Sequence, residues 1–199
     1  MRIIGITGPT GAGKSLICNY LKELGIPCID ADSVYHELLL PPSDCLDAIR
    51  ATFGNDIFSP DGKLDRAKLA LIVFNDPKKL DLLNRTVLGK VLCEIRLIIA
   101  DYRRKGFDTV VVDAPTLIES GFHKECSVVI SILAPEKDRM KRIIERDSLS
   151  DQKAMERIKA QKSNEFYKEN SDCVIINDGD PATLKSSLID VLKQIKIVT

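Results

Sequence analysis

The stretch Gly8-Pro9-Thr10-Gly11-Ala12-Gly13-Lys14-Ser15 fits the phosphate-loop pattern GxxxxGK[ST] and directly follows an apolar run over residues 3–7. Triphosphate oxygens repel one another and hold water tightly, so a site for them needs several N–H donors that converge without a side chain in the way. Glycines allow the backbone to supply these donors. A helix after the loop adds its first amides and its positive dipole end. The stretch therefore predicts a strand, a phosphate-binding loop and a helix, in that order.

The residues that end this loop carry the chemistry expected of it. Lys14 would span the β- and γ-phosphates, and the Ser15 hydroxyl would take one position on Mg²⁺. An apolar face at helical spacing then runs from Leu16 to Leu24 and stops at Gly25. The structural alternative is a glycine-rich turn that binds nothing. The predicted nucleotide-binding set is Gly8, Gly11, Ala12, Gly13, Lys14, Ser15 and Leu16.

Composition favours an enzyme core with a small-molecule partner. A chain of 199 residues is long enough for one α/β domain, or for one with a modest insertion. Lys plus Arg equals Asp plus Glu at 29 each, so we expect no net field that would recruit nucleic acid or a membrane. The N-terminal apolar run is only a strand long, so no signal peptide or membrane span is expected.

The six cysteines are dispersed, form no CxxC pair and lie mostly in apolar runs. This pattern predicts buried thiols in a reducing cytoplasm rather than disulfides or a zinc site.

Short apolar runs alternate with amphipathic helical patterns along most of the chain. Such runs predict the strands of a parallel sheet that is covered by helices on both faces. We therefore expect an α/β fold, the three-layer sandwich of the P-loop NTPases with a five-stranded parallel sheet. The predicted strands lie at residues 3–7, 26–29, 109–113, 128–133 and 173–176.

Residues 41–106 differ from the rest because helical patterns follow one another there with no strong strand between them. We interpret this block as a helical domain inserted into the sheet, which covers and selects the acceptor substrate. A purely structural cover is the alternative. Residues 1–40 and 107–199 would then form the nucleotide-binding core, including a lid at about 137–165.

Acidic residues follow two of the predicted strands. Asp30 and Asp32 follow the second strand, and Asp113 closes the third. Ligands of parallel sheets bind beyond the carboxyl ends of the strands, and a carboxylate there can accept the proton of an attacking hydroxyl or hold Mg²⁺ through water. Alternatively, Asp30 or Asp32 merely caps the helix predicted at residues 33–40.

A basic helical stretch at residues 139–147 is the candidate lid. Arg142 and Arg146 lie four residues apart and so share one helix face, from which they could neutralise charge that develops on a triphosphate. A solvated helix with Arg–Glu pairs is the alternative. Residues 148–150 would be its hinge. Asn177 follows the last strand and has the alternative role of shaping a turn.

Eight motifs follow one another along nearly the whole chain. They are GPTGAGKS, IDAD, FG with DGKLDR, LN at Leu83-Asn84, VVDAPTLIESG, RxxxRD at 142–147, RIKAQ and SDCVIIND. This ordered series resembles the dephospho-coenzyme A kinase family. The resemblance implies a P-loop kinase with a core, a helical domain for the coenzyme A moiety and a lid. It would transfer the γ-phosphoryl of ATP to the ribose 3′-hydroxyl of dephospho-CoA, which gives CoA and ADP in the last step of coenzyme A biosynthesis.

This resemblance also implies roles for single residues. The family's general base falls on Asp32, and Lys14 and Ser15 match its phosphate and Mg²⁺ residues. Arg142 and Arg146 match the lid arginines, of which Arg142 would act in catalysis together with Asp32 and Lys14. Asn177 matches an asparagine near the ATP base, while Asp30 and Asp113 would reach Mg²⁺ through water.

The chain departs from the family pattern at several positions. Pro9 and Thr10 stand where the family has a glycine and a hydrophobic residue, and neither change touches the glycines or the lysine of the loop. Leu88-Gly89 replaces a His-Pro pair, and Thr116 replaces a leucine. The last two changes lie on the acceptor side and therefore concern the substrate pocket.

Two other functions stay open from the residues alone. A kinase for a nucleoside monophosphate would share the loop, the sheet and the lid. A GTPase-type switch would need a base-reading NKxD motif after a strand, whereas the strand ends here read Leu133-Ala134-Pro135-Glu136 and Ile176-Asn177-Asp178-Gly179. His36 and His123 have no ligand partner in the sequence pattern and are expected to be surface or packing residues.

Overall fold

A computed structural model of the protein describes residues 1–74 and 76–197. The chain forms two compact units, Met1–Ile29 with Tyr102–Thr199, and Asp30–Asp101. We call them the core unit and the helical unit. The helical unit begins at Asp30, so it includes residues 30–40, which the sequence analysis grouped with the core.

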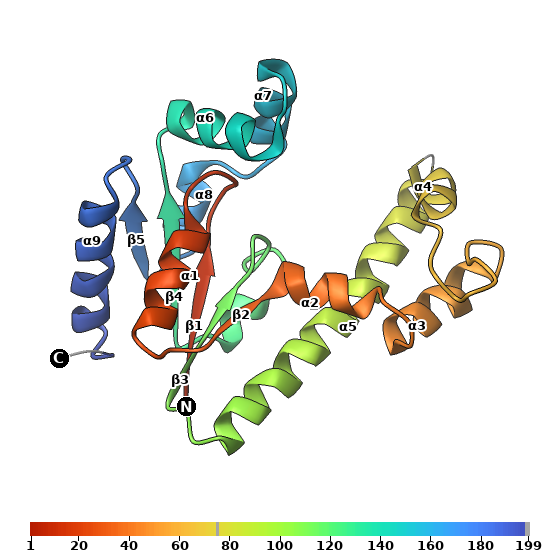
Figure 1. Ribbon diagram of the computed structural model, residues 1–199, viewed down its shortest axis with the longest axis horizontal. Coiled ribbons are helices and arrows are strands. Elements are labelled where there is room, and N and C mark those ends of the chain that lie inside the picture. The colour runs from red at the N-terminus through yellow and green to blue at the C-terminus, as the bar shows by residue number, and fades with distance from the viewer. Residues whose placement is uncertain (75, 198–199) are drawn as a thin grey trace. The chain divides into compact units, whose positions relative to one another are not determined.

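The core unit contains the predicted parallel sheet, which the structure confirms (Figure 1). The strands lie in the order β2-β3-β1-β4-β5, so that β1 is central. β1 pairs in parallel with β3 and β4, and β4 pairs in parallel with β5. The phosphate loop follows the central strand directly. The strands are β1 (Arg2–Thr7), β2 (Cys28–Asp30), β3 (Thr109–Asp113), β4 (Val128–Leu133) and β5 (Cys173–Ile176).

Helices cover both faces of this sheet. α1 (Lys14–Glu23) and α9 (Pro181–Gln194) pack in one cluster with the side chains of β1 and β4, because their apolar faces carry residues such as Ile17 and Leu188. Side chains alternate between the faces of a strand. On the opposite face, Leu133 of β4 therefore packs against Tyr167 of α8 (Asn164–Glu169). The short α8 and the 3₁₀ helix η1 (Phe122–Glu125) were not predicted from the sequence.

The two helices α6 (Glu136–Asp147) and α7 (Asp151–Lys159) form a hairpin with a small core of its own. Ile143 of α6 packs there against Ala154 and Ile158 of α7. The hairpin covers most of the segment predicted to be a lid. Ser148, between the helices, has a positive φ of 51°, and Ser150 caps α7 by accepting a hydrogen bond from Lys153 N.

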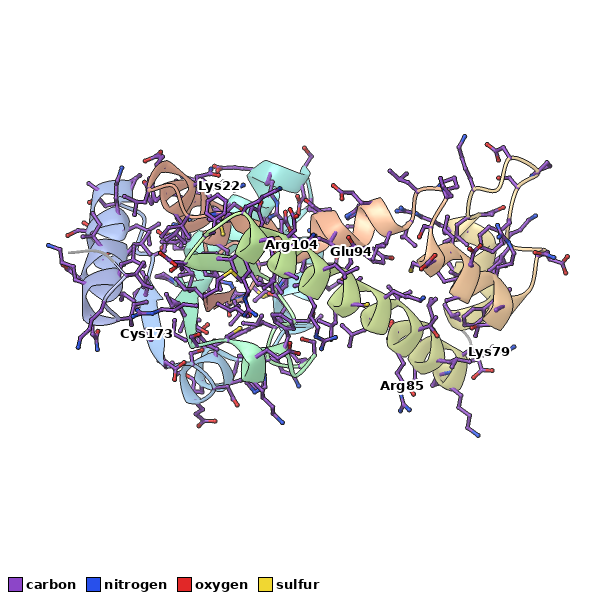
Figure 2. The ribbon with its side chains drawn as sticks, turned by 90° about the horizontal axis from the view of Figure 1, so that it is seen from below. Lys22, Lys79, Arg85, Glu94, Arg104 and Cys173 are labelled. Atoms are coloured by element: carbon purple, nitrogen blue, oxygen red, sulfur yellow. The ribbon has the colours of Figure 1, made fainter. Side chains whose placement is uncertain are left out.

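The helical unit is built as the apolar periodicity predicts. α2 (Ala31–Leu38), α3 (Asp44–Phe53) and α4 (Arg66–Phe74) precede the long α5 (Pro77–Arg104). A cluster centred on Leu46, Ile49 and Ile57 forms the core of this unit. Lys79 and Arg85 of α5 are labelled in Figure 2, and Arg85 pairs with Asp81. The helix also exposes the apolar side chains of Leu82 and Leu97.

Among the described helices, none is long and apolar enough to cross a membrane. The cysteines are free thiols, and two of them, Cys18 and Cys45, are buried, whereas Cys93 on α5 is exposed.

Candidate active site

The phosphate loop approaches later parts of the core unit so closely that glycine is required in it. Gly11 has a φ of +76°, and a Cβ there would lie 2.7 Å from the carbonyl oxygen of Arg139. Gly13 has a φ of +102°, and a Cβ there would lie 2.2 Å from Asn177 Nδ2. Residues that carry a Cβ are strained in both of these backbone conformations, whereas glycine adopts them readily. The loop therefore fits between α6 and the end of β5 only because these positions have no side chain.

Three successive carbonyl groups of the loop accept hydrogen bonds from side chains far along the chain. The acceptors are the carbonyl oxygens of Thr10, Gly11 and Ala12, and the donors, in the same order, are Arg139 Nε at 2.9 Å, Arg142 Nη1 at 3.0 Å and Asn177 Nδ2 at 2.8 Å. Buried carbonyls need such partners. Here the partners fix which way each peptide group faces.

The orientation of the carbonyls determines that of the neighbouring N–H groups. A trans peptide is planar, so its N–H points away from its carbonyl oxygen. The bond from Arg139 to Thr10 O therefore directs the N–H of Gly11 the other way, and the bond from Asn177 to Ala12 O does the same for Gly13. For the N–H groups of Gly11, Gly13 and Ser15, no hydrogen bond to another residue is found within the described chain. Such a row of amides is an anion-binding cradle.

The beginning of α1 adds to this cradle. Gly13 is the N-cap residue of α1, no side chain caps the helix there, and its first turn carries no acidic residue. The positive end of the helix dipole is therefore not neutralised by the protein. Lys14 Nζ lies 2.9 Å from the carbonyl oxygen of Gly8 and so folds over the start of the loop. Leu16 donates its N–H to Gly13 O and packs its side chain against the sheet core.

The two predicted lid arginines lie at the loop. Besides its bond to Gly11 O, Arg142 donates from Nη2 to Asn177 Oδ1 at 3.2 Å. Arg146 donates from Nη2 to the hydroxyl of Thr10 at 3.4 Å, and its Nε lies 2.8 Å from Asp147 Oδ1. The structure thus brings both arginines and Asn177 together with the phosphate loop, although 165 residues separate Asn177 from Ala12.

Two further residues, Arg139 and Gln161, belong to this site although their role was not predicted from the sequence. Arg139 is only 5% exposed, and burial lowers the pKa of its guanidinium. Gln161 Oε1 accepts hydrogen bonds from Thr10 N at 2.9 Å and from Arg139 Nη2 at 3.0 Å. Arg139 precedes Arg142 by three residues, which is the spacing of one helix face, and this spacing could have revealed it.

Asp113 ends β3 directly opposite Ile6 of β1, which places it one strand away from the start of the loop. The thiol of Cys18 in α1 donates to Asp113 Oδ2 at 3.4 Å. A hydrogen bond with Cys28, burial and the negative charge of Asp113 all raise the pKa of Cys18 well above its usual range. The Cys18 thiol therefore stays protonated as a donor to this carboxylate.

The residues of the core unit fit a magnesium ion. Mg²⁺ prefers oxygen ligands and is usually held by one or two protein oxygens together with substrate phosphates. Ser15 and Asp113 offer a hydroxyl and a carboxylate. Within the described chain no group of three or more His, Cys, Asp or Glu side chains could hold a metal ion by itself. The donor set therefore suits an ion that arrives with a polyphosphate.

In the helical unit, Asp30 and Asp32 have different environments. Asp30 is the N-cap of α2: its Oδ1 accepts from Asp32 N at 2.9 Å and from Ser33 N at 3.3 Å, and its Oδ2 accepts from the Ser33 hydroxyl. Because of this cap, α2 begins at Ala31, two residues before the predicted start. Asp32 is exposed, and no hydrogen bond or ion pair of its carboxylate is found in the described part of the chain. His36 Nδ1 donates to the backbone carbonyl of Asp32.

Comparison with known proteins identifies the family. The family model of dephospho-CoA kinase matches residues 2–183.

The chain belongs to the dephospho-CoA kinase family.

Two curated dephospho-CoA kinases illustrate the relationship. The protein from Carboxydothermus hydrogenoformans is 35% identical over 98% of this chain and 94% of its own length. The protein from Dehalococcoides mccartyi is 37% identical over 94% of this chain and 93% of its own length. Among solved structures, dephospho-CoA kinase from Campylobacter jejuni has a TM-score of 0.70 and 26% sequence identity, with 98% of each chain covered.

This member of the dephospho-CoA kinase family has an acidic pocket in its helical unit. The pocket has a volume of about 490 Å³. Glu94, which Figure 2 labels on α5, is one of its lining residues. Four carboxylates line the pocket, and that of Asp47 is paired with Arg50 at 2.9 Å, so the lining carries an excess of negative charge, which disfavours phosphate groups. The lining carboxylates belong to Glu37, Asp44, Asp47 and Glu94.

The departures from the family pattern have simple local surroundings. Thr10 uses its N–H, its carbonyl and its hydroxyl in contacts with Gln161, Arg139 and Arg146. A Cβ on Gly89 would meet no atom within 4 Å, so a larger residue would fit there. Thr116 is exposed at the exit of β3. None of these substitutions disturbs the cradle of N–H groups.

Proposed function

We propose that the chain binds ATP in the cradle of the phosphate loop and transfers its γ-phosphoryl group to the ribose 3′-hydroxyl of dephospho-CoA, which gives CoA and ADP. One observation carries the nucleotide part of this proposal. The carbonyls of Thr10, Gly11 and Ala12 are all held by side chains, while the N–H groups of Gly11, Gly13 and Ser15 have no partner among the described residues. A chain of phosphate oxygens supplies the acceptors that these amides need.

Positive side chains would neutralise the transferred group. Lys14 would span the β- and γ-phosphates, and Arg142 and Arg146 would act from the lid on charge that spreads over the equatorial oxygens. Asn177 would lie beside the base of ATP, with Leu16 as the last residue of the binding set.

Magnesium would be held by Ser15 directly and by Asp113 and Asp30 through water. The bound ion supplies charge neutralisation on the phosphate oxygens. Asp30 can contribute only through water, since its own oxygens cap α2.

Asp32 would be the general base. The 3′-hydroxyl oxygen forms a bond to the γ-phosphorus as the bond from that phosphorus to the β–γ bridging oxygen breaks, so that ADP leaves. The proton of the hydroxyl passes to the Asp32 carboxylate. Two features support Asp32 over Asp30 in this role: Asp30 is engaged as a helix cap, and Asp32 is exposed with no partner for its carboxylate in the described residues.

The remaining parts of the chain would select the acceptor and exclude water. Residues 41–106 would bind the dephospho-CoA moiety, and we expect its diphosphate to bind outside the acidic pocket because four carboxylates line that pocket. A lid at 137–165, with its hinge at 148–150, would close over both substrates and limit hydrolysis of ATP. The proposed setting is the cytoplasm, where thiols stay reduced.

A coupled assay with competing acceptors tests this function. Purified protein with ATP and Mg²⁺ is offered dephospho-CoA, AMP, CMP or UMP, and ADP release is followed while the product is identified by mass spectrometry. Of the four acceptors, we expect only dephospho-CoA to support ADP release. Its product should carry one additional phosphoryl group on the ribose. The matched variant Lys14→Met should be inactive and controls for contaminating kinases. A preference for a nucleoside monophosphate would contradict the proposal, and a larger thermal shift with GTP than with ATP would overturn its nucleotide assignment.

A further inference from the structure

Gln161 lies in the connection that follows α7, and it contacts the phosphate loop through one atom. Its Oε1 accepts from the N–H of Thr10 at 2.9 Å and from Arg139 Nη2 at 3.0 Å. Arg139 in turn donates from Nε to the carbonyl of Thr10 at 2.9 Å. The N–H and the carbonyl of Thr10, which belong to the peptide groups on either side of this residue, are therefore both held. Together with Gln161 and Arg139 they close a ring of three hydrogen bonds.

The direction of one phosphate-binding amide depends on this ring. The carbonyl of Thr10 and the N–H of Gly11 belong to the same planar peptide group, so Arg139 aims that N–H away from itself and toward the cradle. Arg139 is 5% exposed, and no ion pair with an acid is found for it among the described residues. Its guanidinium is therefore oriented by uncharged acceptors, of which the Gln161 oxygen is the one side-chain acceptor recorded in the described chain.

Gln161 also connects the loop to the helical hairpin. It lies two residues after the end of α7, and α7 packs against α6 through Ile143, Ala154 and Ile158. A movement of α7 along α6 would therefore pull on Thr10 through Gln161.

We propose that Gln161 is a positioning residue for the nucleotide: its carboxamide oxygen holds Thr10 and Arg139 so that the N–H of Gly11 faces the phosphates, and it couples the α6–α7 hairpin to the phosphate loop. The proposal extends the function proposed above, since it names the residue that sets the geometry of that binding site. Gln161 itself contacts no reacting atom.

The chemistry of the side chain provides a sharp pair of variants. Gln161 acts as an acceptor through Oε1 alone in the contacts described, so Gln161→Glu keeps both hydrogen bonds, whereas Gln161→Met keeps the length of the side chain and removes the acceptor. Gln152 is the matched control, because it lies exposed on α7 and its one side-chain hydrogen bond within the described residues goes to Glu156 of its own helix. Gln152→Met should behave as the wild type in every measurement.

The first measurement is amide hydrogen exchange at Thr10, followed by NMR in the absence of nucleotide. We expect exchange at Thr10 to accelerate about tenfold in Gln161→Met, as for the loss of one net hydrogen bond, and to stay at the wild-type rate in Gln161→Glu. Unchanged exchange in Gln161→Met would overturn the proposal. Accelerated exchange in both variants would also overturn it, because the acceptor oxygen would then not be the cause.

The second measurement separates positioning from general stability. Gln161→Met should raise the KM for ATP and the Kd for ATP by about tenfold, while the KM for dephospho-CoA stays close to wild type. Equal changes in both KM values would assign Gln161 a merely structural role and overturn the proposal. If the wild type itself bound no ATP while Thr10 exchange changed as expected, the proposed function would fail and the contact of Gln161 with the loop would stand.

Discussion

Asn177 Nδ2 lies 2.8 Å from the carbonyl oxygen of Ala12, so the residue after the last strand holds the middle of the first loop. The same side chain accepts from Arg142 Nη2 at 3.2 Å and from Gly179 N at 3.2 Å. Asn177 is 5% exposed, so water has little access to replace these partners. It connects the phosphate loop, the lid arginine and the end of β5 in one network.

Asn177→Ala should therefore destabilise the protein and weaken ATP binding. The Ala12 carbonyl would be left without its donor in a buried place, which costs about 1–3 kcal/mol of unfolding free energy. A chain of this length loses about 2–4 °C in Tm for each kcal/mol. The control is Asn170→Ala, which removes a similar bond from Nδ2 to Phe166 O at an exposed helix end and should change stability by less than about 0.5 kcal/mol. Equal Tm values for the two variants would contradict the network.

Asp32→Asn should lower turnover by about 10²–10⁴ while ATP binding stays nearly intact, because a positioned base contributes this much and does not contact ATP. Steady-state kinetics with dephospho-CoA and an ATP titration measure the two effects separately. Asp190→Asn is the control, because Asp190 is an exposed aspartate on α9 outside the proposed site. Turnover of Asp32→Asn within a few-fold of wild type would remove Asp32 from the role of general base.

Gly11→Ala should impair ATP binding and stability much more than Gly106→Ala does, although both glycines have a similar positive φ, +76° and +85°. At Gly106 a Cβ would meet no atom within 4 Å, so only backbone strain of about 1–2 kcal/mol is expected. At Gly11 the Cβ would also lie 2.7 Å from the backbone oxygen of Arg139, so the loop must move away from α6. We expect Gly11→Ala to lose ATP binding in calorimetry and Gly106→Ala to keep it. If both variants bound ATP alike, close packing of the loop on α6 would not matter for binding.

Asp147 should stabilise the α6–α7 hairpin in a pH-dependent way. Hydrogen bonds from Arg146, with further attraction from Arg157, hold the pKa of its carboxyl below the usual range. A depressed pKa contributes stability above the unfolded-state value near 4, and this contribution is lost as pH falls through the folded-state value. Asp147→Asn should thus melt below the wild type at pH 7, and the two melting curves should converge under acid conditions. Because the pair is at the surface, added salt should also reduce the difference. A difference in Tm that persisted unchanged at low pH would show that the ion pairs are not its source.

The strands and the phosphate loop could be predicted from local signals, while the support of the loop could not. Apolar runs such as Val128–Leu133 and the motif at 8–15 carry their information in adjacent residues, and their positions are confirmed. The helix α8 is six residues long and too short for a periodic apolar face, so it was missed. The three-residue spacing of Arg139 and Arg142 indicates a shared helix face, but it does not indicate that Arg139 is buried against the carbonyl of Thr10. Gln161 was visible within a family motif, but nothing in its sequence context indicates that it reaches Thr10.

The distance along the chain between the loop and its supports has a consequence for synthesis on the ribosome. The motif at 8–15 emerges early, yet Arg139, Gln161 and Asn177 hold its peptide groups only after nearly the whole chain has been translated. A nascent chain that ends before β5 therefore displays the phosphate-binding sequence without its geometry. We expect nucleotide capture to begin only when Asn177 has left the exit tunnel, so that unfinished chains do not sequester nucleotide.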